Sequence, residues 1–126
     1  MRTLMIAFLM VFGLSATAQQ VELDWENPIH KVNNSVYELT IDNSEEVIVK
    51  YTQLREDKSV SQTGFYRNQK PCGIWKMYDL EGNVISTMFY KNGKRQKLTS
   101  MHLGEQVTVY YQNNRPMKRV TIAYIN

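Results

Sequence analysis

Short runs rich in β-branched and aromatic residues alternate with polar, turn-forming clusters along most of this chain. The joints between runs are too short for the helix of a parallel crossover, so neighbouring strands should pair antiparallel. The pattern therefore predicts an all-β fold, an antiparallel meander of repeated β-hairpins, with no helix after Gln19. The predicted strands lie at 36–41, 47–54, 60–66, 74–78, 84–90, 98–103, 107–111 and 117–125.

One five-residue phrase occurs three times, each time directly after an aromatic residue. The copies are Tyr66-Arg67-Asn68-Gln69-Lys70, Tyr90-Lys91-Asn92-Gly93-Lys94 and Tyr111-Gln112-Asn113-Asn114-Arg115. Asn and Gly tolerate the positive φ of a two-residue hairpin turn, so each copy predicts a strand end followed by a tight turn. A half-phrase at 78–83 lies between the first two copies, and strand plus turn thus recurs roughly every 12 residues.

Two-residue turns also predict which residues face each other. Around Asn92-Gly93, Lys91 should face Lys94 and Tyr90 should face Arg95, with apolar side chains on both sides of the hairpin. Around Asn113-Asn114, Val107 should pair with Val120 and Val109 with Lys118. The second pairing predicts one apolar face, made of Val107, Val109, Tyr111, Val120, Ile122 and Tyr124.

The N-terminus has the pattern of a secretory signal peptide. Arg2 precedes an apolar run at 4–14 that is too short to span a bilayer, and Ala16 and Ala18 supply the small residues that a signal peptidase recognises. We expect residues 1–18 to be removed before Gln19 and the protein to be secreted or periplasmic. Residues 19–35 are then an N-terminal arm or short strand, and residues 36–126 a single antiparallel β-repeat domain, without a transmembrane segment.

Charge is strongly divided along the chain. From Gln19 to Asp57 there are nine acidic and three basic residues, whereas from Lys58 onward there are three acidic and eleven basic residues. Three interpretations stay open. The acidic part could dock on the basic part, the basic part could face an anionic partner, or its cations could simply be solvated and discourage edge-to-edge aggregation.

The stretch from Gly64 to Asn83, followed by Phe89-Tyr90-Lys91-Asn92-Gly93-Lys94, resembles the variant MORN repeats of bacterial proteins. Those repeats combine a Tyr-x-Asn-Gly-Lys phrase with a Gly-x-Trp-x-x-Tyr element, here Gly73-Ile74-Trp75-Lys76-Met77-Tyr78. The resemblance covers Gly64 to Arg115, about half the chain, and the Gly-x-Trp element occurs once. It implies an elongated antiparallel repeat sheet that serves as a scaffold or interaction surface. Some such proteins are described as antitoxin components, which leaves an antitoxin-like or immunity-like role as an alternative.

Catalytic and metal-binding patterns are weak. Cys72 is the only cysteine, so it has no disulfide partner within the chain. A small exported enzyme that uses Cys72 as nucleophile would need His30 or His102 close to the thiol, and nothing in the spacing assembles them. Two distant histidines and one cysteine make a zinc site improbable, and 79–83 lacks the spacing of a calcium loop. We therefore expect a protein without catalytic activity, metal or cofactor.

Binding is the function that the composition favours. Aromatic residues recur with the repeat, and cations are interleaved with them in the second half of the chain. Rings beside cations suit an unknown protein partner, a polysaccharide or an anionic lipid surface, whereas nucleic acid is a poor choice for an exported chain without a known reader fold. A homo-oligomer stays open, and the rings could equally form the core. The candidate binding residues are Tyr66, Trp75, Tyr78, Tyr90, Tyr111, Lys91, Lys94, Arg95, Lys97, Arg115 and Lys118.

Overall fold

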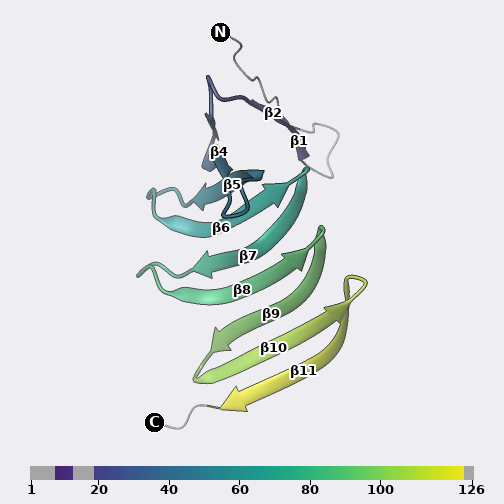
Figure 1. The fold of residues 1–126 in the computed structure, drawn as a ribbon. Coiled ribbons are helices and arrows are strands. Elements are labelled where there is room, and N and C mark those ends of the chain that lie inside the picture. Colours follow the sequence, from purple (N-terminus) through teal and green to yellow (C-terminus); the bar gives the residue numbers. More distant parts are fainter. Residues whose placement is uncertain (1–7, 13–18, 124–126) are drawn as a thin grey trace.

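The computed structural model describes residues 8–12 and 19–123 of the chain. They form a two-stranded hairpin and an open nine-stranded sheet in which every strand pairs antiparallel with its neighbours in sequence (Figure 1). Within these ranges there is no helix, so the predicted all-β meander is confirmed. The strands are β1 (Phe8–Phe12) and β2 (Gln19–Leu23) in the hairpin, then β3 (Ile29–Val32), β4 (Ser35–Ile41), β5 (Val47–Leu54), β6 (Val60–Arg67), β7 (Lys70–Tyr78), β8 (Val84–Lys91), β9 (Lys94–His102), β10 (Glu105–Gln112) and β11 (Arg115–Ala123) in the sheet.

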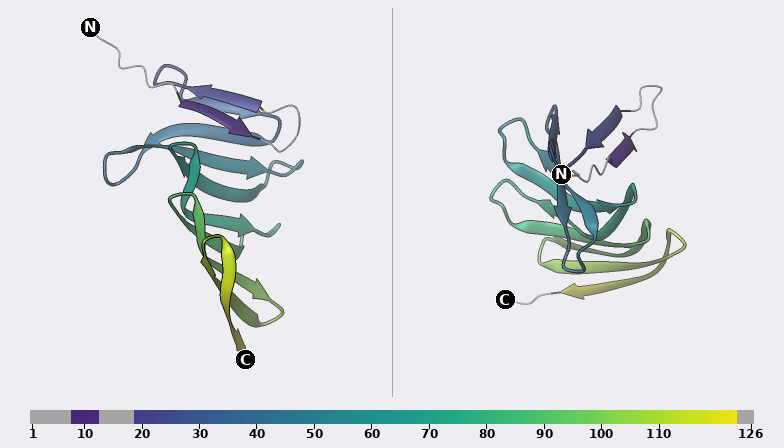
Figure 2. Two further views of the ribbon diagram at one scale, coloured as in Figure 1. Left: turned by 90° about the vertical axis from the view of Figure 1, so that its right-hand side faces the viewer. Right: turned by 45° about the horizontal axis from the view of Figure 1, so that its top comes forward.

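All eight predicted strands are present, and several extend a few residues further into the polar joints. The sheet follows sequence order from β3 at one edge to β11 at the other. Its strands twist progressively, so the sheet is curved, and the β1–β2 hairpin lies beside its N-terminal end (Figure 2). The two termini of the described chain are therefore at opposite ends of the molecule (Figure 1).

The predicted two-residue turns form along one side of the sheet. Both residues have positive φ at Asn68-Gln69, Asn92-Gly93 and Asn113-Asn114, with values between 51° and 80°, as a type I′ turn requires. Neighbouring turns are also linked, because the Gly93 amide donates to the Pro71 carbonyl at 3.2 Å and the Arg95 amide donates to Asn114 Oδ1 at 2.9 Å. A fourth tight turn lies at Leu103-Gly104, so the strand predicted to end at 103 ends one residue earlier, at His102.

Longer turns with an aspartate recur at 42–46, 55–59 and 79–83. In the last of these, Asp79 Oδ1 accepts the amides of Glu81 and Asn83 at 3.0 and 2.8 Å. Asp42 accepts the amides at the same two offsets, from Ser44 and Glu46. Such side-chain acceptors hold a turn together locally, which is why the sequence breaks from strand to turn at these aspartates.

Bulges or irregularities shift the register of five strand pairs, including the two hairpins whose facing residues the sequence predicts. Lys91 pairs with Lys94 and Tyr90 with Arg95, as predicted, but Phe89 then pairs with Lys97, which leaves Gln96 as an extra residue. Met117 is likewise extra in β11, so Val120 lies opposite Thr108 rather than Val107. The predicted apolar face of the last hairpin is therefore wrong for Val120 and Ile122, because one inserted residue moves the rest of β11 to the other face. Tyr124, the last residue of that predicted face, lies outside the described residues.

The core lies at the N-terminal end of the sheet. Leu23, Tyr37, Leu39 and Val49 are buried together, and Trp25 packs against them. A row of rings continues this core across five adjacent strands, with centroid separations of 5.0–6.0 Å, from Tyr37 through Tyr51, Tyr66 and Trp75 to Tyr90. We call this side of the sheet the core face. Large rings supply much of the buried area that a single thin sheet needs.

Candidate functional site: a basic trough on the open face

The side of the sheet opposite the core face is hollowed, and we call it the trough face. It carries Phe65 from β6, Phe89 from β8 and Tyr110 from β10, which are placed there by strand alternation. Phe89 and Tyr110 leave 42% and 37% of their surface exposed. Exposed aromatic residues gathered on one face mark an interaction surface more often than isolated ones do.

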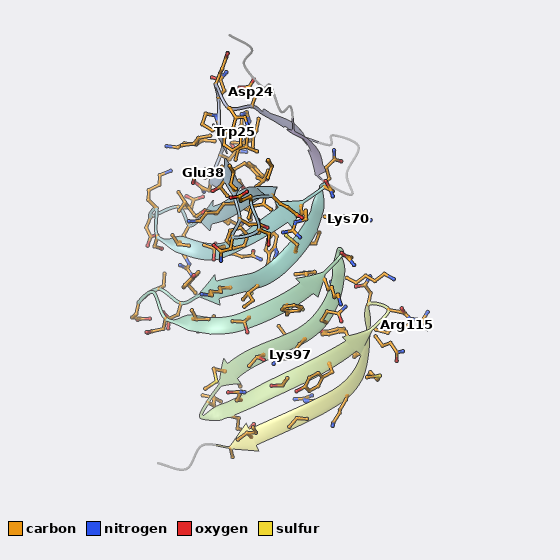
Figure 3. All side chains as sticks on the ribbon, in the orientation of Figure 1. Asp24, Trp25, Glu38, Lys70, Lys97 and Arg115 are labelled. Atoms are coloured by element: carbon orange, nitrogen blue, oxygen red, sulfur yellow. The ribbon has the colours of Figure 1, made fainter. Side chains whose placement is uncertain are left out.

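The first hollow on this face has a volume of about 920 Å³. Ile48, Phe65, Cys72 and Phe89 contribute apolar surface to it. Its cationic lining residues are Lys50, Arg67, Lys70 and Lys91. Lys70 follows the turn at 68–69 and is the first residue of β7 (Figure 3).

A second hollow of about 690 Å³ adjoins the first, and Phe89 lines both. Its apolar lining includes Ile74, Tyr110 and Met117. Lys76 and Lys97 bring positive charge, and Thr87 and Thr99 bring hydroxyl groups. The two hollows thus meet at Phe89, and together we call them the trough. Aromatic residues line both hollows, and lysines stand among them.

Strand register arranges the residues in and beside the second hollow as two parallel rows. Directly paired residues put Ile74, Phe89, Lys97, Tyr110 and Lys118 side by side on β7 to β11. The row two residues along the strands on the same face consists of Lys76, Thr87, Thr99, Thr108 and Val120. Adjacent strands are about 4.8 Å apart, so Phe89 and Tyr110, and likewise Lys97 and Lys118, should lie about 10 Å apart.

Positive charge dominates this end of the molecule. Strands β7 to β11 contain nine Lys and Arg residues and one carboxylate, Glu105. Among the described residues, ion pairs occur only where Arg67 contacts Asp42 and, at 3.1 Å, Glu46. Docking of the acidic part on the basic part is therefore limited to this one arginine within the described chain, and the lysines of the second hollow have no carboxylate partner there.

The predicted binding residues separate into three groups. Tyr66, Trp75 and Tyr90 belong to the aromatic row of the core face, and Trp75 is 93% buried there, with 7% of its surface exposed. Burial raises the pKa of the Tyr66 hydroxyl, with smaller contributions from neighbouring tyrosines. Its ring is therefore part of the packing and not an open surface.

A second group lies at the turns. Lys91 and Lys94 face each other at the end of the β8–β9 hairpin, and the Arg95 guanidinium lies 6.0 Å from the centroid of the Tyr111 ring. Arg115 begins β11 beside the last turn (Figure 3). These cations line the turn side of the sheet.

The third group lies on the trough face, where Lys97 and Lys118 flank Tyr110 (Figure 3 labels Lys97). Tyr78 is on the same face, and its hydroxyl lies 3.2 Å from Thr63 Oγ1. The sequence did not single out Phe89, Tyr110 or Lys76 as site residues. Counting outward from the turn could have found Phe89, whereas the face of Tyr110 relative to Lys118 depends on the bulge at Met117.

The geometry does not assemble the cysteine site considered as an alternative. Burial raises the pKa of the Cys72 thiol, so the unreactive protonated form dominates at neutral pH. His102 ends β9 at the far end of the sheet from Cys72, about 20 Å away along the strands. His30 pairs with Tyr37 and so lies on the core face, whereas Cys72 pairs with Phe65 on the trough face.

Metal-binding clusters and membrane-spanning helices are not found in the described part of the chain. No group of three or more His, Cys, Asp and Glu side chains there could hold a metal ion. The same residues contain no helix with the length and apolar character needed to cross a membrane.

Comparisons of this chain with protein-family models, with curated protein sequences and with solved structures give no match. The resemblance to MORN repeats therefore rests on the motifs in the sequence.

Proposed function

We propose that the protein is an exported, noncatalytic β-repeat module that binds an anionic partner on its trough face. The observation that carries the proposal is the trough, two adjoining hollows lined by aromatic residues and by lysines that have no carboxylate partner among the described residues. Like charges gathered on one face repel each other unless an opposite charge is near, so a bound anion stabilises the arrangement.

The shape of the site supports binding rather than catalysis. Both hollows are open on the sheet surface and are lined mainly by cations, hydroxyls, side-chain amides and rings. The first hollow also contains the Cys72 thiol and Asp42, whose carboxylate is paired with Arg67. Catalysis needs groups brought within hydrogen-bond reach of each other, as a nucleophile and its base are. The trough instead spreads its groups along several strands, which suits recognition of an extended partner.

Adjacent cations on β11 provide the test. Lys118 pairs with Tyr110 on the trough face, whereas Arg119 pairs with Val109 and points to the core face. Lys118→Glu and Arg119→Glu therefore change the net charge equally but on opposite faces. Binding of the mature protein to labelled polyglutamate, polygalacturonate and vesicles containing phosphatidylglycerol would be measured at about 10 mM salt, where the screening length is about 30 Å.

We expect at least one of these polyanions to bind and to dissociate as salt is raised to about 150 mM, where screening shortens to about 8 Å. Lys118→Glu should weaken binding by about tenfold, and Arg119→Glu should change it much less. Failure of every polyanion to bind at low salt would refute the proposal. Equal losses in the two variants would also refute it, because they would mean nonspecific attraction to a basic protein.

A further inference from the structure

The trough face in and beside the second hollow presents three kinds of group in an ordered array. Its first row alternates a ring and a cation across four strands, from Phe89 through Lys97 and Tyr110 to Lys118. Its second row carries the hydroxyls of Thr87, Thr99 and Thr108, of which Thr108 is buried and the other two are partly exposed. From Ile74 to Lys118 the first row crosses four strand spacings, or about 19 Å.

Each kind of group matches a different part of an acidic sugar. An aromatic ring packs against the apolar C–H face of a pyranose, a lysine ammonium attracts a carboxylate, and a threonine hydroxyl can exchange hydrogen bonds with sugar hydroxyls. In a linear polymer of such sugars these parts recur at a regular distance. The trough repeats its ring and its cation about every 10 Å, so successive units can use equivalent positions.

The form of the hollow favours this ligand over the other anionic partners. A lipid chain is best held in an enclosed apolar cavity, whereas here Ile74, Phe89 and Tyr110 are 49%, 42% and 37% exposed and lysines stand among them. A peptide strand would add to the β11 edge by backbone hydrogen bonds rather than lie across four strands. A polyhydroxylated, negatively charged chain uses the rings, the cations and the hydroxyls together.

We propose that the row from Phe89 to Lys118 is a binding site for an acidic polysaccharide, which lies across strands β8 to β11 with its carboxylates at Lys97 and Lys118. This inference rests on the proposed function, since it names the ligand class of the same face. Tyr110 is the central ring, between the two lysines, and Phe89 is the ring at the boundary of the two hollows.

The test compares four probes with the mature protein. Polygalacturonate oligomers long enough to cover about 19 Å are the positive probe, and the same oligomers with methyl-esterified carboxylates keep the sugar but lose the charge. Polyglutamate keeps the charge without the sugar, and vesicles containing phosphatidylglycerol present the anionic lipid alternative. We expect polygalacturonate to bind at least about tenfold more tightly than each of the other three.

Variants at Tyr110 test the role of the ring. Tyr110→Ala should weaken polygalacturonate binding by about tenfold, whereas Tyr110→Phe, which keeps the ring, should bind within about twofold of the unchanged protein. Lys97→Gln should weaken polygalacturonate binding by about fivefold, whereas Arg119→Gln, on the core face, should leave this binding unchanged. Circular dichroism and denaturation midpoints establish that each variant is folded. If Tyr110→Ala does not fold, the unchanged protein is titrated with polygalacturonate and its amide chemical shifts are followed instead. We expect the largest shifts on β8 to β11.

The outcomes separate this inference from the proposed function. Equal binding of polyglutamate and polygalacturonate, with no loss in Tyr110→Ala, overturns the polysaccharide site while leaving an anion-binding face in place. Preference for vesicles, equal binding of the methyl ester, or shifts confined to β4 to β6 also overturns it. Absence of binding by every polyanion overturns both.

Discussion

At the scale of single residues, the tightest constraint is the contact between Gly64 and Trp75. A Cβ atom built at Gly64 would lie 2.0 Å from Cδ2 of the Trp75 ring, so the indole lies directly over the glycine backbone. The indole N–H also donates to the carbonyl of Phe65 at 3.2 Å. Any side chain at position 64 would displace the Trp75 ring, which links Tyr66 to Tyr90 in the aromatic row.

Gly64→Ala should therefore lower the free energy of unfolding by about 2 kcal/mol or more, because the ring and its neighbours must shift to make room. Urea denaturation followed by tryptophan fluorescence measures this. Gly82→Ala is the control, since no atom lies within 4 Å of a Cβ there and only the strain of a φ of +86° is added, about 1 kcal/mol. A smaller loss for Gly64→Ala than for Gly82→Ala would contradict the packing seen here.

The aromatic row also predicts a response to alkaline pH. Burial, with a contribution from the nearby Tyr51, raises the pKa of Tyr37 from 10.0 to about 12. A raised pKa in the folded state means that this tyrosine's contribution is complete below pH 10 and is lost as pH rises towards 12. The denaturation midpoint should fall over that interval, and less so in Tyr37→Phe. Titration of the Tyr37 ring signals near pH 10 in the folded protein would contradict this prediction.

At the scale of elements, the type I′ turns combine a backbone requirement with a packing contact. Gly93 has a φ of +80°, and a Cβ there would lie 3.1 Å from the Cβ of Lys70 in the neighbouring hairpin. Gly93→Val should destabilise the protein by about 1 kcal/mol or more, because a β-branched residue strongly disfavours this φ. Gly93→Asn is the matched control, since Asn114 occupies the same turn position with a φ of 64°. Equal denaturation midpoints for the two variants would contradict the turn geometry.

The sequence predicts strands and turns well because both depend on local residue chemistry. Asn92-Gly93 can adopt positive φ at both positions, and the flanking runs are rich in β formers, so element and pairing follow directly. The same holds for Tyr90 opposite Arg95 and Lys91 opposite Lys94, which lie between the turn and the first bulge. Close to a turn, register is set by the turn itself.

The faces beyond the bulges could not be predicted in the same way. Gln96 has no glycine or proline beside it that would mark an inserted residue. Pro116 stands next to Met117, but proline is equally common at the start of an edge strand, so it does not identify an inserted residue there. One insertion reverses the face of every later residue, so Lys118 lies beside Tyr110 on the trough face. The trough is therefore a product of long-range register that the local sequence pattern does not reveal, although its residue types were recognisable.

At the scale of the whole molecule, the predicted cleavage before Gln19 separates β1 from the rest of the structure. β1 lies within residues 1–18, which the sequence predicts to be removed, whereas Leu23 at the end of β2 is 1% exposed and belongs to the core. We expect the exported protein to begin at Gln19 and to retain the nine-stranded sheet. Intact-mass measurement of exported material tests this, and a mass that includes residues 1–18 would contradict it.

The position of the core at one end has a consequence for how the molecule opens. Among the side chains that the structure describes, the buried apolar ones lie between Leu23 and Trp75, and in β11 every side chain except that of Val120 is exposed. Each strand of a single open sheet is held mainly by its two neighbours, as in a repeat array, so strands can detach one after another from a free edge. Native-state hydrogen exchange should show amide protection that falls stepwise from β5 towards β11, and uniform protection would contradict this. β10 and β11 carry Tyr110 and Lys118, half of the ring-and-cation row. A ligand bound across β8 to β11 would therefore stabilise the edge that detaches first, and amide protection should increase most in these strands.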